Sequence, residues 1–438
     1  MKDTAQRIFR NTLAAIDIPA TIEKKLARGG TLISVQGACI DLSAFDEILA
    51  IAFGKASLAM AEGLVRVLTP EFQPEGILVA PSAPPRNLPG WKVFIGGHPI
   101  PNDESFAAGR AILNRLERCS ERTLIFFLIS GGGSAMVDQP LDPAITLDDF
   151  RALHAALVTC GAPIEEMNVV RKHLSATKGG RLAAAASHSM KITLAVSDVP
   201  PGQESALASG PTLPDPSTID DVIRVVSEYD LAAKLPASIR GALDANALQE
   251  TPKPGDAAFA RSHFVMLLGE HELLHTAHHA CEAEGYICVR ERSTDDWPVE
   301  KAAEYLLAQL KALADANPGE AVALLADGEL SSPVTGDGIG GRNAAFVLAC
   351  VEKISGKNIT VLSAGTDGID GNSAAAGAVA DGKTAARARH ARLDPRDFQS
   401  RSDSHRFFSA LGDAIVTSPT GNNLRDLRIL LSGEARKP

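Results

Sequence analysis

Six short apolar runs limit what this chain can fold into more than any other feature of its sequence. None of them alternates regularly with polar residues, and each leads toward a glycine-rich or acidic turn. The runs cover residues 47–53, 123–129, 191–196, 263–268, 321–326 and 358–364. Runs of this kind are typical of strands buried on both faces. Helical stretches such as 106–118 and 300–316 lie between them. The alternation predicts an α/β fold, in which right-handed crossovers join largely parallel strands and helices cover both faces of each sheet.

A stretch with few large apolar residues separates the runs into two blocks. Residues 248–262 hold two prolines and one glycine. A chain of 438 residues also exceeds the ~100–200 residues of a typical domain. We therefore predict a Rossmann-like α/β domain over residues 1–250 and a second α/β domain over residues 260–438. Residues 414–432 are predicted to form two short strands around a polar loop.

Net charge and cysteine spacing argue against several classes of protein. A formal net charge of −10 gives no electrostatic basis for binding nucleic acid. None of the six cysteines has C-x-x-C spacing, and scattered cysteines suit a reducing compartment. No apolar run approaches the ~20 residues of a membrane span, and the first residues lack the apolar core of a signal peptide. We expect a cytoplasmic protein with no nucleic-acid partner and no membrane partner.

The turns after the apolar runs hold the residues with the most chemistry. In an open α/β sheet, ligands bind outside the carboxyl ends of the strands. One run is followed by Ser130-Gly131-Gly132-Gly133-Ser134, whose glycines let backbone N–H groups approach an anion closely. Lys55 comes almost directly after another run, and Arg342 stands at the start of an apolar helix. The alternative interpretation is a tight turn and two surface cations.

Acidic residues follow several of the same runs. They are Asp198, Asp327, Glu329, Asp337 and Asp367. Any single one of them is explained as a helix N-cap. Five beside a glycine-rich loop favour Mg²⁺, which binds through one or two carboxylates, waters and substrate phosphates. Glycine loop, carboxylates, lysine and arginine are together the groups that phosphoryl transfer requires.

Three further motif matches are interpreted as coincidental. Gly377–Thr384 fits G-x-x-x-x-G-K-[ST], but no convincing strand precedes it. His271–His275 fits H-E-x-x-H, yet no third zinc ligand follows at the expected spacing, so a solvated histidine-rich helix face is favoured. Gly336–Gly341 fits a dinucleotide-binding fingerprint, but residues 330–335 separate it from the preceding apolar run.

Together, the loops resemble those of the class II glycerate kinases (glycerate 2-kinases), whose second domain is called the MOFRL domain. The resemblance spans nearly the whole chain in family order. The matching stretches are 52–56, 97–101, 130–135, 170–183, 197–218, 336–349, 363–371 and 420–431. It implies two α/β domains with the active site in the cleft between them. It also implies phosphorylation of D-glycerate at its 2-hydroxyl by ATP with Mg²⁺, giving 2-phosphoglycerate and ADP. The loop Asp327-Gly328-Glu329 departs from the Gly-Gly-Glu expected there.

The resemblance also assigns functional residues. The family's lysine, aspartate and arginine fall on Lys55, Asp198 and Arg342. Lys55 would neutralise charge on the γ-phosphate, and the loop from Ser130 to Ser134 would hold phosphate or substrate. Asp198 would orient or deprotonate the substrate hydroxyl, or ligate magnesium. Arg342 would bind the glycerate carboxylate through its planar fork of donors. Second candidates for the carboxylate are Arg171 and Lys172, and candidate magnesium ligands are Glu329 and Asp367.

Three other functions stay open on the sequence alone. Some relatives are called hydroxypyruvate reductases of tartrate degradation, which would use NAD(P)H. A zinc hydrolase would rest on His271–His275 only. A small-molecule binding protein without catalysis would leave the acidic and glycine-rich loops unexplained. The oligomeric state is also open, with a homodimer as one option.

Overall fold

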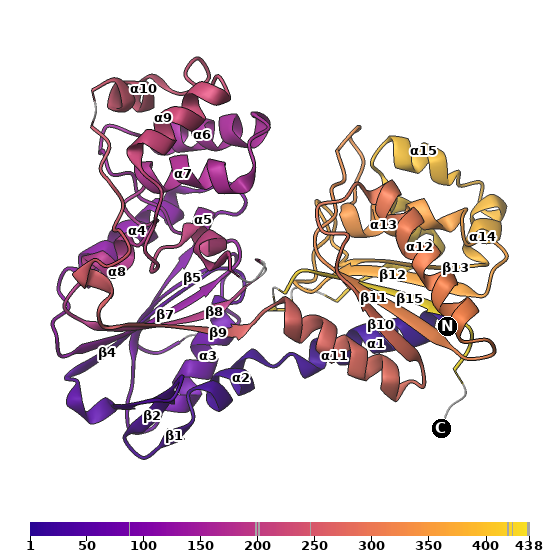
Figure 1. The fold of residues 1–438 in the computed structure, drawn as a ribbon, viewed down its shortest axis with the longest axis horizontal. Coiled ribbons are helices and arrows are strands. Elements are labelled where there is room, and N and C mark those ends of the chain that lie inside the picture. Colours follow the sequence, from indigo (N-terminus) through magenta and orange to yellow (C-terminus); the bar gives the residue numbers. More distant parts are fainter. Residues whose placement is uncertain are drawn as a thin grey trace. The chain divides into compact units, whose positions relative to one another are not determined.

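The computed structural model describes residues 1–86, 88–197, 199, 202–245, 247–417, 420–422 and 424–435, and only the backbone of Glu270. The chain divides into two compact units (Figure 1). Ile18–Leu268 form the first unit, and Met1–Asp17 together with Gly269–Pro438 form the second. Each unit has one large sheet with helices packed on it, so the predicted α/β class is confirmed.

The first unit is built on a six-stranded parallel sheet. Its strands are β4 (Glu47–Phe53), β5 (Glu75–Ala80), β6 (Trp91–Ile95), β7 (Thr123–Ser130), β8 (Met190–Val196) and β9 (Ser262–Leu268). They lie in the order β6-β5-β4-β7-β8-β9, and every neighbouring pair is parallel. Every residue of β7 is buried, as its unbroken apolar run predicts. The chain builds the sheet outward from β4 to one edge and then outward from β7 to the other.

Helices cover both faces of this sheet. α4 (Asp103–Leu116) and α8 (Arg181–Ala185) pack on the face to which Ile51 and Phe127 point. Successive strand residues point to opposite faces, and the residues just before these two, Ala50 and Phe126, are equally buried. α3 (Ser57–Leu68) packs on β4, β5 and β7, and α2 (Ile18–Lys25) packs on α3 and β9. A small antiparallel sheet follows α2, made of β1 (Arg28–Gly29), β2 (Leu32–Val35) and β3 (Ala38–Asp41).

Four more helices of the first unit gather at one end as a helical layer (Figure 1). They are α6 (Leu147–Thr159), α7 (Ile164–Leu174), α9 (Ile219–Glu228) and α10 (Ala237–Asp244). The layer has a hydrophobic core of its own, which includes Phe150, Leu157 and Val225. α6 begins with a capping box, because Thr146 Oγ1 accepts the N–H of Asp149 (3.2 Å) and Asp149 accepts the N–H of Thr146 (2.8 Å). The cap fixes the start of α6 and therefore which of its side chains face α7.

The second unit has a mixed six-stranded sheet. In spatial order its strands are β10 (Ile287–Glu291), β11 (Val322–Asp327), β15 (Asp426–Ser432), β12 (Ile359–Gly365), β13 (Gly377–Asp381) and β14 (Ala414–Ile415). β10 and β11 are parallel, and the other four pairings are antiparallel. This sheet differs from the largely parallel one predicted. Unbroken apolar runs indicate burial on both faces, which helices produce whatever the strand direction. They could not show that the last strand enters between β11 and β12 in reverse.

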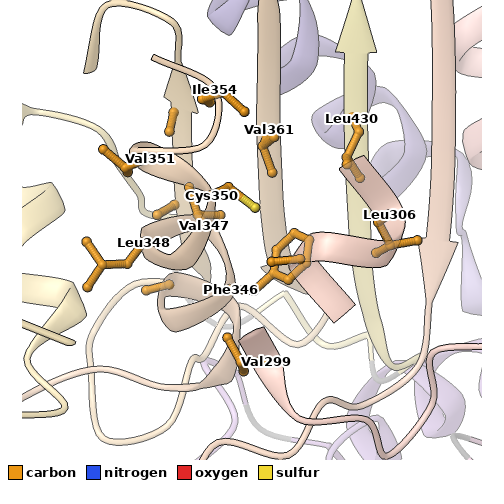
Figure 2. Packing of buried hydrophobic residues seen from close by; sticks show 14 of the residues in the cluster. Val299, Leu306, Phe346, Val347, Leu348, Cys350, Val351, Ile354, Val361 and Leu430 are labelled. Carbon is orange, nitrogen blue, oxygen red and sulfur yellow. The ribbon is translucent and has the colours of Figure 1, made fainter. Parts of the chain in front are cut away.

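The helices of the second unit lie on both sides of its sheet. They are α1 (Lys2–Ala15), α11 (Glu270–Ala283), α12 (Val299–Ala316), α13 (Arg342–Val351), α14 (Thr384–His390), α15 (Pro395–Ser400) and α16 (Ser404–Leu411). On one side, Phe346 and Val347 of α13 pack with Leu306 of α12 and Leu430 of β15 (Figure 2). Fully burying one such large side chain contributes ~1.5–3 kcal/mol. α1 and α11 pack on each other and on the same sheet, α1 on β12, β13 and β15 and α11 on β10 and β11.

The division between the units falls at Leu268 rather than within residues 250–260. β9 pairs with β8, so the fourth apolar run completes the first sheet instead of starting the second. The proline-containing stretch belongs to the first unit, where the N–H of Asp215 donates to the carbonyl of Pro252 (2.9 Å). α1 belongs to the second unit, where Lys2 Nζ donates to Asp413 (2.7 Å). Proline and glycine here mark an irregular path across one unit.

In the part of the chain that the structure describes, no helix is long and apolar enough to cross a membrane.

Candidate active site

The glycine-rich loop and Lys55 meet at one place in the first unit. β4 and β7 are neighbours, and the strand order runs away from them in both directions. At such a switch point, the loops that leave the two carboxyl ends diverge and open a crevice. The N–H of Lys55 donates to the carbonyl of Gly131 (3.0 Å), and the N–H of Ala56 donates to Ser130 Oγ (2.9 Å). The backbone of each loop is thus fixed by the other.

Two glycines are required for this junction. Gly54 has φ +112°, and a Cβ there would collide with the carbonyl and hydroxyl oxygens of Ser130. Gly132 has φ +81°, and a Cβ there would lie 2.9 Å from the imidazole of His98. Both positions have backbone conformations that disfavour other residues. α5 (Gly133–Met136) begins inside the loop, but it is only one turn long.

A cavity of about 260 Å³ opens beside this loop within the first unit. Gly131, Gly132 and Ser134 line one side of it. α6 and α7 of the helical layer contribute His154, Asn168 and Arg171, and the segment 206–209 also lines the cavity. The cavity therefore joins a candidate phosphate-binding loop to a basic side chain that the sequence singled out.

Arg171 and Lys172 lie next to each other in the sequence but serve different surroundings. Arg171 lines the cavity, where its Nη2 lies 3.1 Å from His154 Nδ1 and its Nη1 lies 3.5 Å from Asn168 Oδ1. No carboxylate of the described residues forms an ion pair with Arg171, and burial lowers its pKa. Lys172 is buried and pairs with Asp215 at 3.1 Å. The structure therefore keeps Arg171 as a candidate for binding an anion and gives Lys172 a structural ion pair.

Several polar groups of the cavity were missed by the sequence analysis. Lys178 Nζ donates to Asp138 Oδ2 (2.6 Å) and to the carbonyl of Ser134 (2.8 Å). Burial lowers the pKa of Lys178, and the nearby Asp138 opposes that shift. Burial, with the charges of Arg171 and Lys178, also lowers the pKa of His154. Lys178 lies in the matched stretch 170–183, but nothing in the sequence indicates that its charge is buried.

Arg342 lies in the second unit and is held between two carboxylates. Its Nε donates to Asp426 Oδ2 (2.6 Å), and its Nη2 lies 2.7 Å from Glu329 Oε1. Burial opposes the charge of Arg342, but Asp426 and Glu329 outweigh burial and raise its pKa. Asp426 was missed as a site residue, although it lies within the matched stretch 420–431. The charge of Arg342 is thus largely compensated inside the protein.

The remaining acidic candidates of the second unit lie in loops that follow its strands. Asp367 Oδ1 accepts the N–H of Ile369 (3.0 Å), and Asp337 lies exposed in the loop before α13. Among the described residues, no three His, Cys, Asp or Glu side chains form a cluster that could hold a metal ion. Asp198, predicted as a catalytic residue, lies outside the described residues.

Asp370 is a buried carboxylate that the sequence analysis did not single out. It accepts the N–H groups of Asn343 (3.0 Å) and Ala344 (2.9 Å), the first turn of α13. Burial raises its pKa to about 6. Asp370 therefore caps the helix on which Arg342 stands.

The structure gives each coincidental motif an ordinary explanation. Gly377 to Asp381 of the apparent P-loop form strand β13, which pairs with β12. In α11, Glu272 accepts the N–H of Gly269 (2.9 Å) as a helix cap, and His271, His275 and His279 are exposed. Gly336–Gly341 lie in a loop, where a Cβ on Gly338 would collide with the backbone of residues 401–403. Close packing accounts for that glycine without a bound dinucleotide.

Comparison with known proteins finds two matching family models and several similar proteins. A family model described as "Domain of unknown function (DUF4147)" matches residues 4–244, and one described as "MOFRL family" matches residues 322–426. A D-glycerate 2-kinase of Thermotoga maritima is 31% identical over 389 residues, which are 88% of this chain and 90% of that protein. A protein of Agrobacterium vitis, provisionally named a hydroxypyruvate reductase, is 34% identical over 443 residues, 99% of this chain and 94% of that protein. The fold is similar to the crystal structure of a glycerate kinase from Thermotoga maritima, with a TM-score of 0.83, 29% identity and 99% of each chain covered.

Proposed function

Because this chain belongs to the class II glycerate kinase family, which joins a DUF4147 domain to a MOFRL domain, we propose that it transfers the γ-phosphoryl group of ATP to the 2-hydroxyl of D-glycerate. The products are 2-phosphoglycerate and ADP. The observation that carries the proposal is the junction of Lys55 with the glycine-rich loop at the switch point of a parallel sheet. Backbone N–H groups and a cation at that place suit a phosphate group.

Different residues of the first unit have different roles in phosphoryl transfer. Such transfer passes through a loose transition state, so alignment and charge stabilisation matter more than a strong base. Lys55 stabilises negative charge on the transferred group, and the loop from Gly131 to Ser134 positions it. Asp198 orients or deprotonates the 2-hydroxyl, or ligates magnesium, and this role rests on the resemblance alone.

Magnesium fits the second unit only as an ion that the nucleotide brings with it. Mg²⁺ keeps several waters and takes one or two carboxylates together with substrate phosphates. Glu329 already binds Arg342, which makes it a weaker ligand than a carboxylate without such an ion pair would be. When bound, the ion neutralises phosphate charge. Arg342 holds Glu329 and Asp426 in position, and it is less suited to bind the substrate carboxylate than the sequence suggested.

A coupled assay on the purified protein tests the proposal. The expected result is ADP formation that requires both D-glycerate and Mg²⁺ and is abolished by EDTA. Hydroxypyruvate with NADH, and separately with NADPH, should give no oxidation of the nucleotide above background. Reduction of hydroxypyruvate without any ADP formation from glycerate would overturn the proposal.

No feature of the residues that the structure describes favours the reductase alternative. A dinucleotide fingerprint acts where a strand leads directly into it, and Gly336–Gly341 follow a loop instead. Cytoplasmic location and a homodimer stay predictions.

A further inference from the structure

The cavity beside the glycine-rich loop has the size of a small ligand. Pockets for drug-sized molecules span ~300–1,000 Å³. A cavity of about 260 Å³ suits a three-carbon acid better than a nucleotide. Its walls also include apolar side chains, Phe150, Leu153 and Leu207, which a short carbon chain can contact.

The charges that line the cavity do not cancel. Lys178 and Asp138 form an ion pair at 2.6 Å, and Ser175 Oγ also donates to Asp138 (2.5 Å). Among the described residues, the side-chain hydrogen-bond partners of Arg171 are the neutral groups His154 and Asn168. A buried charge without a partner is costly. One excess positive charge matches one carboxylate, whereas a triphosphate would need several cations.

His154 is held in the form that can donate to an anion. A guanidinium has only N–H donors, so His154 Nδ1 must accept from Arg171 and carry no proton. The proton of the neutral ring is then on Nε2, and His154 lines the cavity. Arg171 and His154 thus form a paired set of donors on one wall.

A strained segment also lines the cavity. Ala208 has φ +49° and Ser209 has φ +62°, conformations that cost of order 1–3 kcal/mol each in residues other than glycine and cluster at ligand sites. Ser209 Oγ lies 2.8 Å from Ser134 Oγ and donates to Asn168 Oδ1 (3.1 Å). This chain of hydroxyl and amide groups can both donate to and accept from a substrate hydroxyl.

We propose that Arg171, with neutral His154 beside it, binds the carboxylate of the acceptor substrate in this cavity, while the Ser134–Ser209–Asn168 chain binds one of its hydroxyl groups. The identity of the acid as glycerate rests on the proposed function. The proposal makes Arg171, rather than Arg342, the residue that selects acids over neutral alcohols.

Kinetics of Arg171→Met and Arg171→Lys test the carboxylate site, with Arg224→Met as the control. Arg224 is half-exposed on α9 and pairs with Glu166 and Glu228. Losing a hydrogen bond to a charged group costs ~1.5–3 kcal/mol, so the KM for D-glycerate should rise roughly 10- to 150-fold in Arg171→Met. The KM for ATP should change little. Arg171→Lys keeps the charge but loses the fork, and should fall between wild type and Arg171→Met.

A neutral analogue separates charge recognition from general damage. D-glyceramide has an amide in place of the carboxylate, so the preference for D-glycerate over it should collapse in Arg171→Met and persist in Arg224→Met. A rise in the KM for ATP instead would mean that the cavity holds nucleotide phosphate, which overturns the proposal. An unchanged KM for glycerate in a folded Arg171→Met would overturn it as well.

His154 is tested as a positioning and binding residue by two substitutions. His154→Gln keeps an acceptor for Arg171 and a donor toward the cavity, and should retain most of the affinity for glycerate. His154→Phe keeps the ring but neither function, and should raise the KM for glycerate with a smaller effect on kcat. Equal effects of both variants on kcat, with KM unchanged, would show that His154 only packs the wall.

Calorimetric titration with D-glycerate in the absence of ATP separates this proposal from the proposed function. If wild type binds glycerate but does not phosphorylate it, the proposed function fails and the site stands, provided that Arg171→Met weakens the binding. If wild type phosphorylates glycerate and Arg171→Met binds it equally well, the function stands and the site fails. Absence of saturable binding to wild type overturns the site.

Discussion

Arg171 and Arg342 each carry a guanidinium that solvent reaches only in part, but their neighbours differ. Arg342 pairs with Glu329 and Asp426, whereas Arg171 faces a histidine and an asparagine. A further anion stabilises a cation only slightly when two carboxylates already surround it. The same anion stabilises an uncompensated cation strongly. The sequence shows two arginines near glycines and cannot show this difference, because the compensating Asp426 is far away in the chain.

Substitution of Lys55 tests the phosphate-binding junction. Lys55→Ala should lower kcat by roughly 10²–10³-fold, since a fixed charge beside a transferring phosphoryl group is worth several kcal/mol. The backbone contact of residue 55 with Gly131 is unaffected, so thermal unfolding should stay close to that of wild type. Lys92→Ala, on edge strand β6, is the control and should keep full activity. Retained kcat in folded Lys55→Ala would show that Lys55 is a surface residue only.

Substitution of Arg342 separates its structural role from substrate binding. Arg342→Met leaves Glu329 and Asp426 without their partner, and breaking a buried ion pair costs ~3–5 kcal/mol, less where solvent screens it as here. We expect a lower melting temperature and a lower kcat, with the KM for glycerate changed far less than in Arg171→Met. A selective rise in that KM, in a protein of normal stability, would return the carboxylate to Arg342.

At the scale of elements, the helix that carries Arg342 depends on a residue from another loop. Asp370 accepts two N–H groups from the first turn of α13, which has no side-chain cap of its own. The predicted α13 begins at the correct residue because a glycine pair precedes an apolar stretch. Its cap was not predictable, since Asp370 follows a different strand.

Removal of this cap should destabilise the second unit. Asp370→Ala leaves two buried N–H groups without an acceptor, which costs about 1–3 kcal/mol in denaturant unfolding. Asp370→Asn keeps an acceptor oxygen and should lose less. Equal stability of Asp370→Ala and wild type would mean that α13 needs no cap.

The pH dependence of the stability of wild type and Asp370→Asn gives a second test of the role of Asp370. The pKa of Asp370 is raised to about 6, so the folded protein holds this proton more tightly than the unfolded chain. Linkage then requires the contribution of Asp370 to stability to fall as the pH rises from about 4 to above 6. The stability of wild type relative to Asp370→Asn should therefore decline over that range. A constant difference would contradict the raised pKa.

At the scale of the whole molecule, the sequence predicted the class of fold better than its boundaries. The strands at 47–53, 123–129, 191–196 and 263–268 all lie in the first sheet, within a residue or so of their predicted ends. β5 and β6 were missed, and so was the assignment of α1 to the second unit. Those features depend on tertiary pairing, such as Lys2 with Asp413, which no local pattern contains.

The candidate site was also predictable only in part. Lys55 and the Ser130–Ser134 loop follow neighbouring strands, and the rule for carboxyl ends of parallel strands brings them together. Arg171 was predicted as a candidate for binding the carboxylate, but the cavity and the side chains around it were not predicted. His154 and Lys178 could not be named, because their importance comes from burial and from the charged groups around them.

Phosphorus NMR of the reaction product identifies directly which hydroxyl group of D-glycerate receives the phosphoryl group. Purified protein is incubated with D-glycerate, ATP and Mg²⁺, and the new resonance is compared with authentic 2-phosphoglycerate and 3-phosphoglycerate. We expect a single new phosphomonoester resonance that coincides with that of 2-phosphoglycerate, together with stoichiometric ADP. Formation of 3-phosphoglycerate, or no phosphomonoester at all while the protein remains folded, would contradict that expectation.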